Sequence, residues 1–543
     1  MVNSNKLYFL GALCFTTALA IPNCPLLGAD FPPSKNLSSS SIFQAALNNL
    51  TQVLSQSISS GNTAYGAFDG VNTSHSIEIF SAYDDDSPLF SNQFSAPALA
   101  TPEYGVSNVT ADTVFRIGSL TKLIAVYTFL IQAGDRKLND PITDYIPELQ
   151  AAALSLNATQ DPIDYVSWED VTVWEVASQM AGLGRDYSGL GELDAAIDPD
   201  SDPLSHGLPP LNASEIPPCA GLTFCTRAQF FAGFTQRHPV YAPSTNPTYS
   251  NVAFQLLGYV LENITGVDFA TMVSDSIFDP LGLTGSSWTT PDSNSSGILP
   301  PGNNWGQSLG DDNPAGGMYS SSSDLTKIGR SILTSSLLSP AQTRRWMQPR
   351  SFTSSQSAAV GMPWEIFSVK TSPNDRLVFL YTKQGDINGY SSVFVIIKDW
   401  NIGFNVLTAG NAATSNSLLI ANLISDTIFQ AAEDAAREES QTNFVGTYQA
   451  ADPNLNSSIT VTMDASKPGL GVTRWISNGT DMLSPAVELV GVAAQSVRLY
   501  PSSLERDLGN GDMEVGFRGA FENLGFLETV GGSFGLHCAT WVS

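Results

Sequence analysis

The chain is poor in basic residues. Its 543 residues include 24 lysines and arginines against 51 aspartates and glutamates, which gives a formal net charge of −27. Binding to nucleic acid needs lysine and arginine in excess, and anionic membranes attract clusters of the same residues. The composition therefore argues against nucleic acid and membrane as partners, and it favours a protein that stays soluble outside a cell.

Histidine and cysteine are scarce as well. The four histidines are scattered along the chain, and the sequence contains neither an H-E-x-x-H segment nor a paired C-x-x-C. Those spacings are typical of metal sites in proteins. A glycine-rich loop that could cradle phosphates is also missing. We therefore expect no metal and no other cofactor.

Long apolar runs are absent apart from one at the N-terminus. The first 20 residues place Lys6 ahead of an apolar run and end in Ala18-Leu19-Ala20, which is the pattern of a secretory signal peptide. The run is too short to span a bilayer comfortably, and no later stretch reaches about 18 uninterrupted apolar residues. The sequence thus predicts a signal peptide over residues 1–20, a mature start near Ile21, and secretion to the extracellular space.

An exported chain of this sequence is expected to carry glycans and disulfides. Four cysteines remain after the signal peptide, and they allow three pairings. The short loop between Cys219 and Cys225 favours that pair, which would leave Cys24 and Cys538 to tie the chain ends together. Glycosylation sequons begin at Asn36, Asn49, Asn72, Asn108, Asn157, Asn212, Asn263, Asn294, Asn456 and Asn478.

The order of predicted elements indicates an α+β fold. An alternating pattern predicts a strand pair at 63–70 and 75–83, and four successive antiparallel strands between 364 and 411. Amphipathic helices are predicted within 41–58 and over 415–440. We expect one antiparallel sheet flanked by helices, with residues 135–345 forming a helical lobe.

The residue pattern of the sequence changes near residue 441. Beyond it, short alternating segments are separated by glycine, asparagine and proline, which predicts a small all-β domain. The expected organisation is a signal peptide (1–20), a main domain (21–440) and a C-terminal β domain (441–543).

A serine and a lysine stand one turn apart at the start of the apolar segment 115–134. Positions i and i+3 share a helix face, so Ser119 and Lys122 are within reach of each other. A serine hydroxyl becomes a nucleophile when a base takes its proton, and burial lowers the pKa of a lysine enough for that task. By itself S-x-x-K is a loose pattern, and a capping serine with a solvated lysine is the commoner cause.

Two later segments add chemistry to this pair. Tyr249 and Asn251 precede an apolar helical segment, and a tyrosine there can shuttle protons when cations lower its pKa. Lys383 and Gly385 fall on a predicted strand. Glycine at that point lets another group approach the strand backbone, whose N–H could then face an oxyanion.

Taken in this order, S-x-x-K, Y-x-N and K-x-G resemble the serine β-lactamase and penicillin-binding-protein superfamily, in its class C-like branch. The resemblance covers roughly residues 45–435, and the tail is similar to the extra β domain of several fungal members. It implies a secreted hydrolase that acts on a small-molecule ester or amide.

The resemblance also assigns roles to individual residues. It implies that Ser119 is acylated, and that Lys122 and Tyr249 share the proton transfers. Asn251 and Lys383 would position and polarise the reacting groups. The backbone N–H groups of Ser119 and of Asp386, which follows Gly385, would form the oxyanion hole.

The chain departs from the family pattern in three places. Gln179 begins a Gln-Met-Ala run where many members have Ser-His-Thr, and Gln384 replaces the frequent threonine or glycine. Asp386 stands where serine or threonine is common. A carboxylate there would repel an antibiotic carboxylate unless its side chain points away, so we expect weak β-lactam hydrolysis.

Other functions remain open from the sequence. G-x-S-x-G, the nucleophile motif of α/β-hydrolases, occurs at 306–310 and 531–535, but neither copy has the strand and helix around it that this fold needs. An acyltransferase could use the same acyl-serine, and an inactive binding protein could use the same fold. The first would transfer the acyl group to an alcohol or amine, and the second would show no serine-dependent chemistry.

Overall fold

A computed structural model of the protein describes two compact units. The described residues are 26–522 without 85–86, 100–104, 156–157, 188–206, 208–211, 213–217, 220–224, 292–293, 372–375, 490–491, 494–495 and 510–511. The larger unit comprises Pro33–Thr371 and Leu377–Glu439, and the smaller one Met1–Pro32, Ser372–Arg376 and Ser440–Ser543. The Cys24–Cys538 pairing falls outside the described residues.

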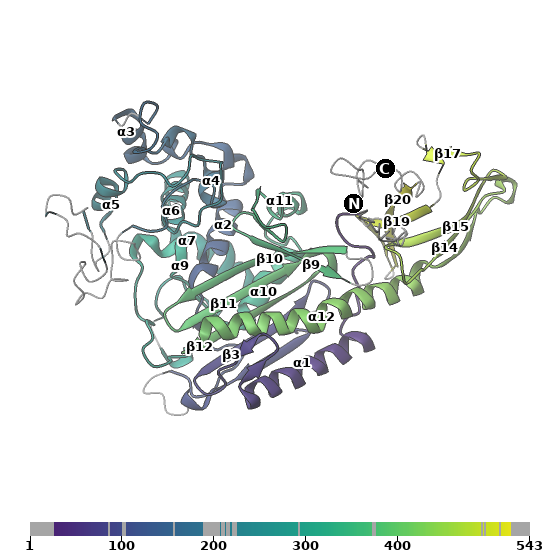
Figure 1. The fold of residues 1–543 in the computed structure, drawn as a ribbon, viewed down its shortest axis with the longest axis horizontal. Coiled ribbons are helices and arrows are strands. Elements are labelled where there is room, and N and C mark those ends of the chain that lie inside the picture. The colour runs from purple at the N-terminus through teal and green to yellow at the C-terminus, as the bar shows by residue number, and fades with distance from the viewer. Residues whose placement is uncertain are drawn as a thin grey trace, which may run out of the picture. The chain divides into compact units, whose positions relative to one another are not determined.

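The larger unit is built on an eight-stranded sheet in the order β4-β3-β12-β11-β10-β9-β8-β7 (Figure 1). Neighbours such as β10 and β11, or β3 and β12, run antiparallel. The strands are β3 Thr73–Ser81, β4 Phe90–Phe94, β7 Ser351–Phe352, β8 Ala358–Val360, β9 Glu365–Thr371, β10 Arg376–Ile387, β11 Tyr390–Ile397 and β12 Ile402–Gly410. The four strands predicted between 364 and 411 are therefore confirmed.

The predicted pairing of 63–70 with 75–83 is wrong. The first segment folds back on itself in the two-residue strands β1 (Asn62–Thr63) and β2 (Gly66–Ala67), while β3 pairs with β4 and β12. Every residue of β3 is buried. A strand buried on both faces is stabilised by neighbours on both edges, here β4 and β12, and a turn-rich segment that pairs with itself is not available as one of them.

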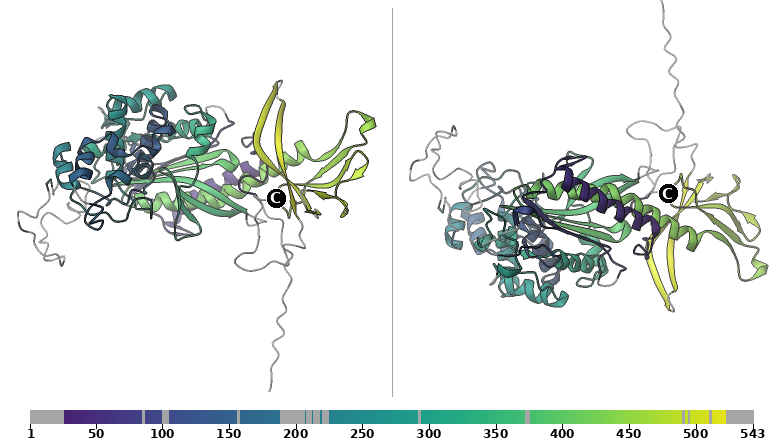
Figure 2. Two further views of the ribbon diagram at one scale, coloured as in Figure 1. Left: turned by 90° about the horizontal axis from the view of Figure 1, so that it is seen from above. Right: turned by 90° about the horizontal axis from the view of Figure 1, so that it is seen from below.

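Helices cover both faces of this sheet, which separates two hydrophobic cores. On one face lie α1 (Ser41–Ser60) and α12 (Ala413–Phe444), which run side by side in Figure 2 and pack on residues such as Leu380. On the other face lie α2 (Thr121–Gln132), α6 (Val252–Thr265) and α10 (Ser322–Leu333), whose core includes Tyr381. Successive strand residues point to opposite faces, so odd-numbered residues at this end of β10 face α2. The predicted fold class is confirmed.

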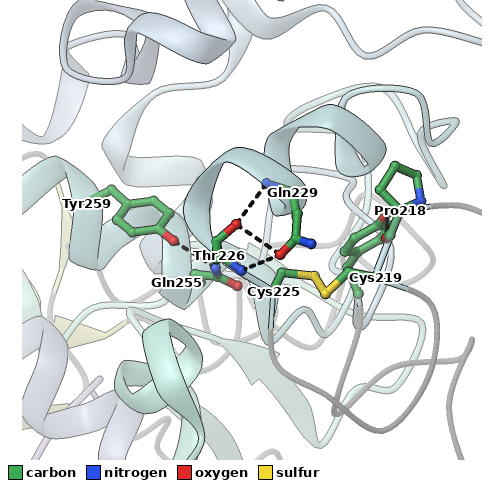
Figure 3. The surroundings of a disulfide bond; sticks show 8 residues. Pro218, Cys219, Cys225, Thr226, Gln229, Gln255 and Tyr259 are labelled. Atoms are coloured by element: carbon green, nitrogen blue, oxygen red, sulfur yellow. Dashed lines mark hydrogen bonds between the residues drawn. A yellow bond between two sulfur atoms is a disulfide. The ribbon is translucent and has the colours of Figure 1, made fainter.

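Shorter helices form the helical lobe of the same unit. They are α3 Pro147–Ser155, α4 Val173–Ala177, α5 Arg227–Phe234, α7 Phe269–Val273, α8 Asp279–Leu281, α9 Asn313–Gly316 and α11 Pro340–Trp346. The predicted Cys219–Cys225 disulfide is present, with Cα atoms 5.6 Å apart (Figure 3). Directly after it, Thr226 and Gln229 form a capping box that starts α5. The disulfide thus closes the loop that leads into this helix.

The smaller unit contains a six-stranded sheet in which β13-β14-β15-β19-β20 are neighbours and β16 pairs with β15. Its strands are β13 Gly446–Gln449, β14 Ser458–Thr462, β15 Leu470–Ser477, β16 Thr480–Asp481, β19 Ser496–Gly509 and β20 Asp512–Glu522. Val472 and Val497 form its small core with partly buried neighbours such as Trp475. The all-β character predicted for the tail is observed, although α12 continues to Phe444, beyond the expected boundary. Among the described helices, none combines the length and apolarity that crossing a bilayer needs.

Candidate active site

Ser119 lies where a short strand meets a buried helix. The chain passes from β5 (Phe115–Arg116) through a 3-10 turn, Gly118–Leu120, into α2. The Thr121 hydroxyl donates to the Gly118 carbonyl at 2.7 Å and accepts from the Met318 N–H at 3.1 Å, which fixes the turn. Residues 121–130 are all buried, whereas Ser119 is half-buried. Ser119 is therefore partly exposed to solvent, at the start of a helix whose first ten residues are buried.

Lys122 is fully buried and contacts Ser119. Its Nζ lies 3.0 Å from Ser119 Oγ, 2.6 Å from Asn251 Oδ1 and 2.5 Å from the Ala315 carbonyl oxygen. A neutral amine has two N–H groups and one lone pair. The two N–H groups can donate to the amide and carbonyl oxygens, which leaves the lone pair for the serine hydroxyl. The surroundings of Lys122 fit a base that takes the Ser119 proton.

Burial favours the neutral form of Lys122. Burial lowers the pKa of the Lys122 ammonium, repulsion from Lys383 lowers it further, and attraction to Tyr249 opposes both. Burial raises the pKa of Asp312 to about 8, so this nearby acid is mostly protonated at pH 7. Burial also raises the pKa of Asp186. Lys122 thus has a lowered pKa and makes no direct contact with a carboxylate among the described residues.

Tyr249 lies close to three basic side chains. The Nζ atoms of Lys122 and Lys383 lie 5.0 and 5.3 Å from the centre of its ring, and the Arg185 guanidinium carbon lies 4.9 Å from it. Burial alone would raise the pKa of Tyr249, but the two lysines and a hydrogen bond with Ser119 lower it below the ordinary value. The phenol can therefore exchange a proton with the serine or with Lys122.

Gln179 holds the loop that carries Tyr249. Its backbone carbonyl accepts the Thr248 N–H and its side-chain Oε1 accepts the Ser250 N–H, both at 2.8 Å. Gln179 reaches this geometry with a φ of 63°, a left-handed conformation. The residue that departs from the family pattern thus fixes the backbone on both sides of Tyr249. Nothing in the sequence signals this role.

Asn251 links Lys122 to the loop after α4. Its Oδ1 accepts from Lys122, its Nδ2 donates to Asp186 Oδ1 at 2.5 Å, and its backbone N–H donates to the Arg185 carbonyl at 2.7 Å. The two side-chain partners fix the orientation of the amide, because one can only donate and the other accepts. Asp186 was not among the residues predicted from the sequence.

Lys383 has a partner that the sequence did not reveal. Its Nζ lies 2.6 Å from Glu365 Oε1 on β9 and 2.7 Å from the Gln384 carbonyl oxygen. The other Glu365 oxygen accepts the Gln384 N–H at 3.0 Å. Burial alone would lower the pKa of Lys383, but Glu365 and Tyr249 raise it above the ordinary value. Lys383 is therefore held as a cation beside the phenol.

The nucleophile turn and β10 touch through two glycines. A Cβ on Gly385 would lie 2.7 Å from the Ser119 nitrogen, and one on Gly118, whose φ is +51°, would lie 2.7 Å from the Asp386 nitrogen. Only glycine allows this approach. The two backbone N–H groups expected at an oxyanion hole are thus brought to adjacent segments.

The Asp386 side chain does not face the nucleophile. Asp386 lies on the α12 side of the sheet, and its carboxylate accepts a hydrogen bond of 2.7 Å from Thr414 in the first turn of α12. Because this carboxylate points away from Ser119, the repulsion expected between it and a substrate anion is not supported by the structure. The N-terminal end of α12 favours a negative charge at this position.

The structure brings Ser119, Lys122, Tyr249, Asn251 and Lys383 into one cluster. The serine of the G-x-S-x-G copy at 306–310 lies instead in a loop, away from any strand-to-helix elbow, and the copy at 531–535 lies outside the described residues. Within the described ranges, no group of three or more histidine, cysteine or acidic side chains is arranged to hold a metal. The cluster is suited to acyl transfer through a serine.

Comparison with known proteins points the same way. Residues 80–425 match the family model described as Beta-lactamase, and residues 436–543 match one described as Beta-lactamase-like-like, C-terminal domain. A "Beta-lactamase-like protein" of Arthroderma benhamiae is 29% identical over 513 residues, which cover 90% of this chain and 83% of that one. A Phoma protein named as a probable hydrolase is 28% identical over 71% of this chain and 63% of its own length.

A solved structure shares the fold. The octameric penicillin-binding protein homologue from Pyrococcus abyssi aligns over 88% of this chain and 96% of its own, with a TM-score of 0.51 and 17% identity.

Proposed function

Since the chain belongs to the β-lactamase family of the serine hydrolase and penicillin-binding-protein superfamily, we propose that it is a serine hydrolase that acts through an acyl-Ser119 intermediate on an ester or amide. The family resemblance expected from the sequence is confirmed by the match over residues 80–425. The name of the Phoma relative, a hydrolase, supports the reaction class. The choice of Ser119 as nucleophile rests on its surroundings.

Acylation would begin with proton transfer from Ser119. The Lys122–Tyr249 pair takes the hydroxyl proton while Oγ bonds to the substrate carbonyl carbon, and the carbonyl oxygen becomes an oxyanion near the Ser119 and Asp386 N–H groups. Collapse of this intermediate breaks the bond to the leaving group, which receives the proton from the same pair. The products are the acyl-serine and a neutral alcohol or amine.

Deacylation would repeat the sequence with water. The pair removes one proton from a water molecule, whose oxygen bonds to the acyl carbon, and the Ser119 Oγ leaves as a hydroxyl after it regains the proton. Lys383 stays protonated throughout and stabilises the negative charge that Tyr249 carries when its phenol loses a proton. The net reaction consumes one water and releases a carboxylic acid.

One observation carries this proposal. A partly exposed serine lies 3.0 Å from a buried lysine that also contacts an amide oxygen and a carbonyl oxygen, and the nitrogens of this lysine and of Lys383 both lie near the ring of Tyr249. A structural lysine has no need of this arrangement, since a carboxylate would satisfy it better.

The experiment is active-site labelling followed by a substrate panel. A fluorophosphonate probe should label the wild type and not Ser119→Ala, while Ser308→Ala, which removes the G-x-S-x-G serine in a loop, should label normally. The panel contains p-nitrophenyl esters, nitrocefin and D-amino-acid amides. Hydrolysis that survives Ser119→Ala, or labelling of neither protein, would refute the assignment; accumulation of a new ester in place of free acid would identify an acyltransferase.

We also propose that the protein is secreted and glycosylated. The N-terminal pattern and the ten sequons support this. Expression in a fungal host should place the protein in the medium with Ile21 or a neighbour as its first residue, and a glycosidase should lower its apparent mass. A protein that stays in the cell and still carries residues 1–20 would contradict the proposal.

A further inference from the structure

We propose that Arg185 is the substrate-binding cation of this site and that it recognises a carboxylate carried by the ester or amide substrate. The inference rests on the proposed function, since it concerns the same nucleophile. It follows from counting the hydrogen-bond donors of the cations that surround Tyr249.

The two lysines have no donors to spare. An ammonium group has three N–H donors, and a neutral amine has two. Lys122 contacts three oxygen atoms. Lys383 contacts Glu365, the Gln384 carbonyl and the Tyr249 phenol. A substrate anion could bind either lysine only by displacing a partner inside the protein.

Arg185 differs in exposure and in the number of its contacts. Its side chain is 67% exposed, and its polar side-chain contact among the described residues is Asp186, with Nε 3.4 Å from Oδ2. A guanidinium group has five N–H donors in a planar fork that matches the two oxygens of a carboxylate. Most of these donors therefore face solvent, next to the ring of Tyr249.

The position of Arg185 is fixed by the catalytic cluster itself. The Arg185 carbonyl accepts the Asn251 N–H at 2.7 Å, and its partner Asp186 accepts from the Asn251 side chain at 2.5 Å. Asn251 in turn contacts Lys122. The cation–π contact with Tyr249 restrains the Arg185 side chain, which reduces the entropy lost when a ligand binds. The guanidinium is thus held beside the ring of Tyr249, whose hydroxyl bonds to Ser119.

Two matched pairs of esters test this role. In the first pair, 3-butyryloxybenzoate and its methyl ester differ by a carboxylate in the leaving group; in the second, the phenyl half-ester of adipic acid and phenyl methyl adipate differ by one in the acyl chain. Each kcat/KM is divided by the rate of hydroxide-catalysed hydrolysis of the same ester, which removes differences in intrinsic reactivity.

We expect the wild type to prefer the carboxylate in at least one pair by about tenfold, mainly through KM. Arg185→Gln should abolish the preference, and Arg185→Lys should restore part of it, since it keeps the charge without the fork. Arg345→Gln, which removes a similarly exposed arginine paired with Asp135, should leave the ratio unchanged. Because Arg185 is exposed, the preference of the wild type should also weaken as salt is added.

The outcomes separate the two proposals. Equal rates within both pairs, or a preference that survives Arg185→Gln, overturn the role of Arg185 and leave the serine mechanism standing. Absence of Ser119-dependent hydrolysis of all four esters overturns the proposed function and this inference with it. If Arg185→Gln does not fold, the salt dependence and Arg185→Lys decide the question.

Discussion

Lys122 and Lys383 are two buried lysines near the ring of the same tyrosine, Tyr249, and they differ in their partners. Their exposed fractions are 0% and 1%, and their nitrogens lie at similar distances from the Tyr249 ring. Glu365 raises the pKa of Lys383 against the effect of burial, whereas burial lowers the pKa of Lys122, which has no such carboxylate. Two equally buried lysines thus have pKa values shifted in opposite directions, and the counter-ion of Lys383 accounts for the difference.

The largest effect on activity is expected when Lys122, the proposed base, is replaced. Lys122→Met keeps the volume of the stem but leaves Ser119 without a proton acceptor, so kcat should fall by about three to four orders of magnitude. The measurement is steady-state hydrolysis of a p-nitrophenyl ester. Lys137→Met, at an exposed lysine, is the control and should retain wild-type activity. A loss below about tenfold would show that Lys122 is not the base.

Tyr249→Phe should have the next largest effect. It keeps the ring that packs between the cations and removes the hydroxyl that shares the proton, which should lower kcat by about two to three orders of magnitude. Tyr145→Phe removes a hydroxyl that bonds to exposed Lys137 and serves as the matched control. Pre-steady-state kinetics will show whether acylation or deacylation is slowed; an unchanged rate for both would exclude the phenol from proton transfer.

Much of this cluster could be predicted from the sequence, because its members carry local signals. Ser119 and Lys122 are one turn apart, and Tyr249 and Lys383 stand at the start of a helix and on a strand that their patterns predict. Glu365 could not be assigned, although its strand was predicted. Its side chain reaches Lys383 only in the observed arrangement of β9 and β10, and sequence alternation does not fix such an arrangement.

The same limit explains the errors in the fold. Residues 75–83 were correctly predicted as a strand, but it pairs with β4 and with β12, which is more than 300 residues away, and not with residues 63–70. Gln179 supports Tyr249 through a left-handed backbone conformation, which the sequence gives no reason to expect for glutamine. Local patterns therefore predicted elements and motifs, whereas contacts between distant segments needed the structure.

The counter-ion itself can be tested through the pH dependence of kcat/KM. Activity should rise with pH as the Lys122–Tyr249 pair loses a proton, and fall at alkaline pH as Lys383 loses its own. Glu365→Gln removes the carboxylate that raises the pKa of Lys383, so the alkaline limb should move to lower pH, with a loss of about tenfold near its new position. Glu148→Gln, which breaks an ion pair with Arg227 elsewhere, should leave both limbs in place. An unmoved alkaline limb would show that Glu365 does not control Lys383.

The smallest effect on activity is expected at Asp312, an acid near Lys122. Its buried carboxyl has a pKa raised to about 8, so it is mostly protonated at pH 7 and leaves Lys122 without a counter-charge. Asp312→Asn mimics that neutral form and should change kcat/KM by less than about threefold at pH 7. Above pH 8 the two proteins should diverge, because only the wild type gains a negative charge near Lys122.

Stability gives an independent measurement of the same group. The folded wild type keeps a proton on Asp312 that the unfolded chain releases near pH 4, so its free energy of unfolding should fall as pH rises from about 4 to about 8. Asp312→Asn lacks this proton, and thermal unfolding followed across that range should show a flatter dependence. If Asp312→Asn instead lost most of its activity at pH 7 with an unchanged pH profile of stability, Asp312 would be an ionised partner of Lys122, and the absence of a counter-ion would no longer explain why Lys122 is the base.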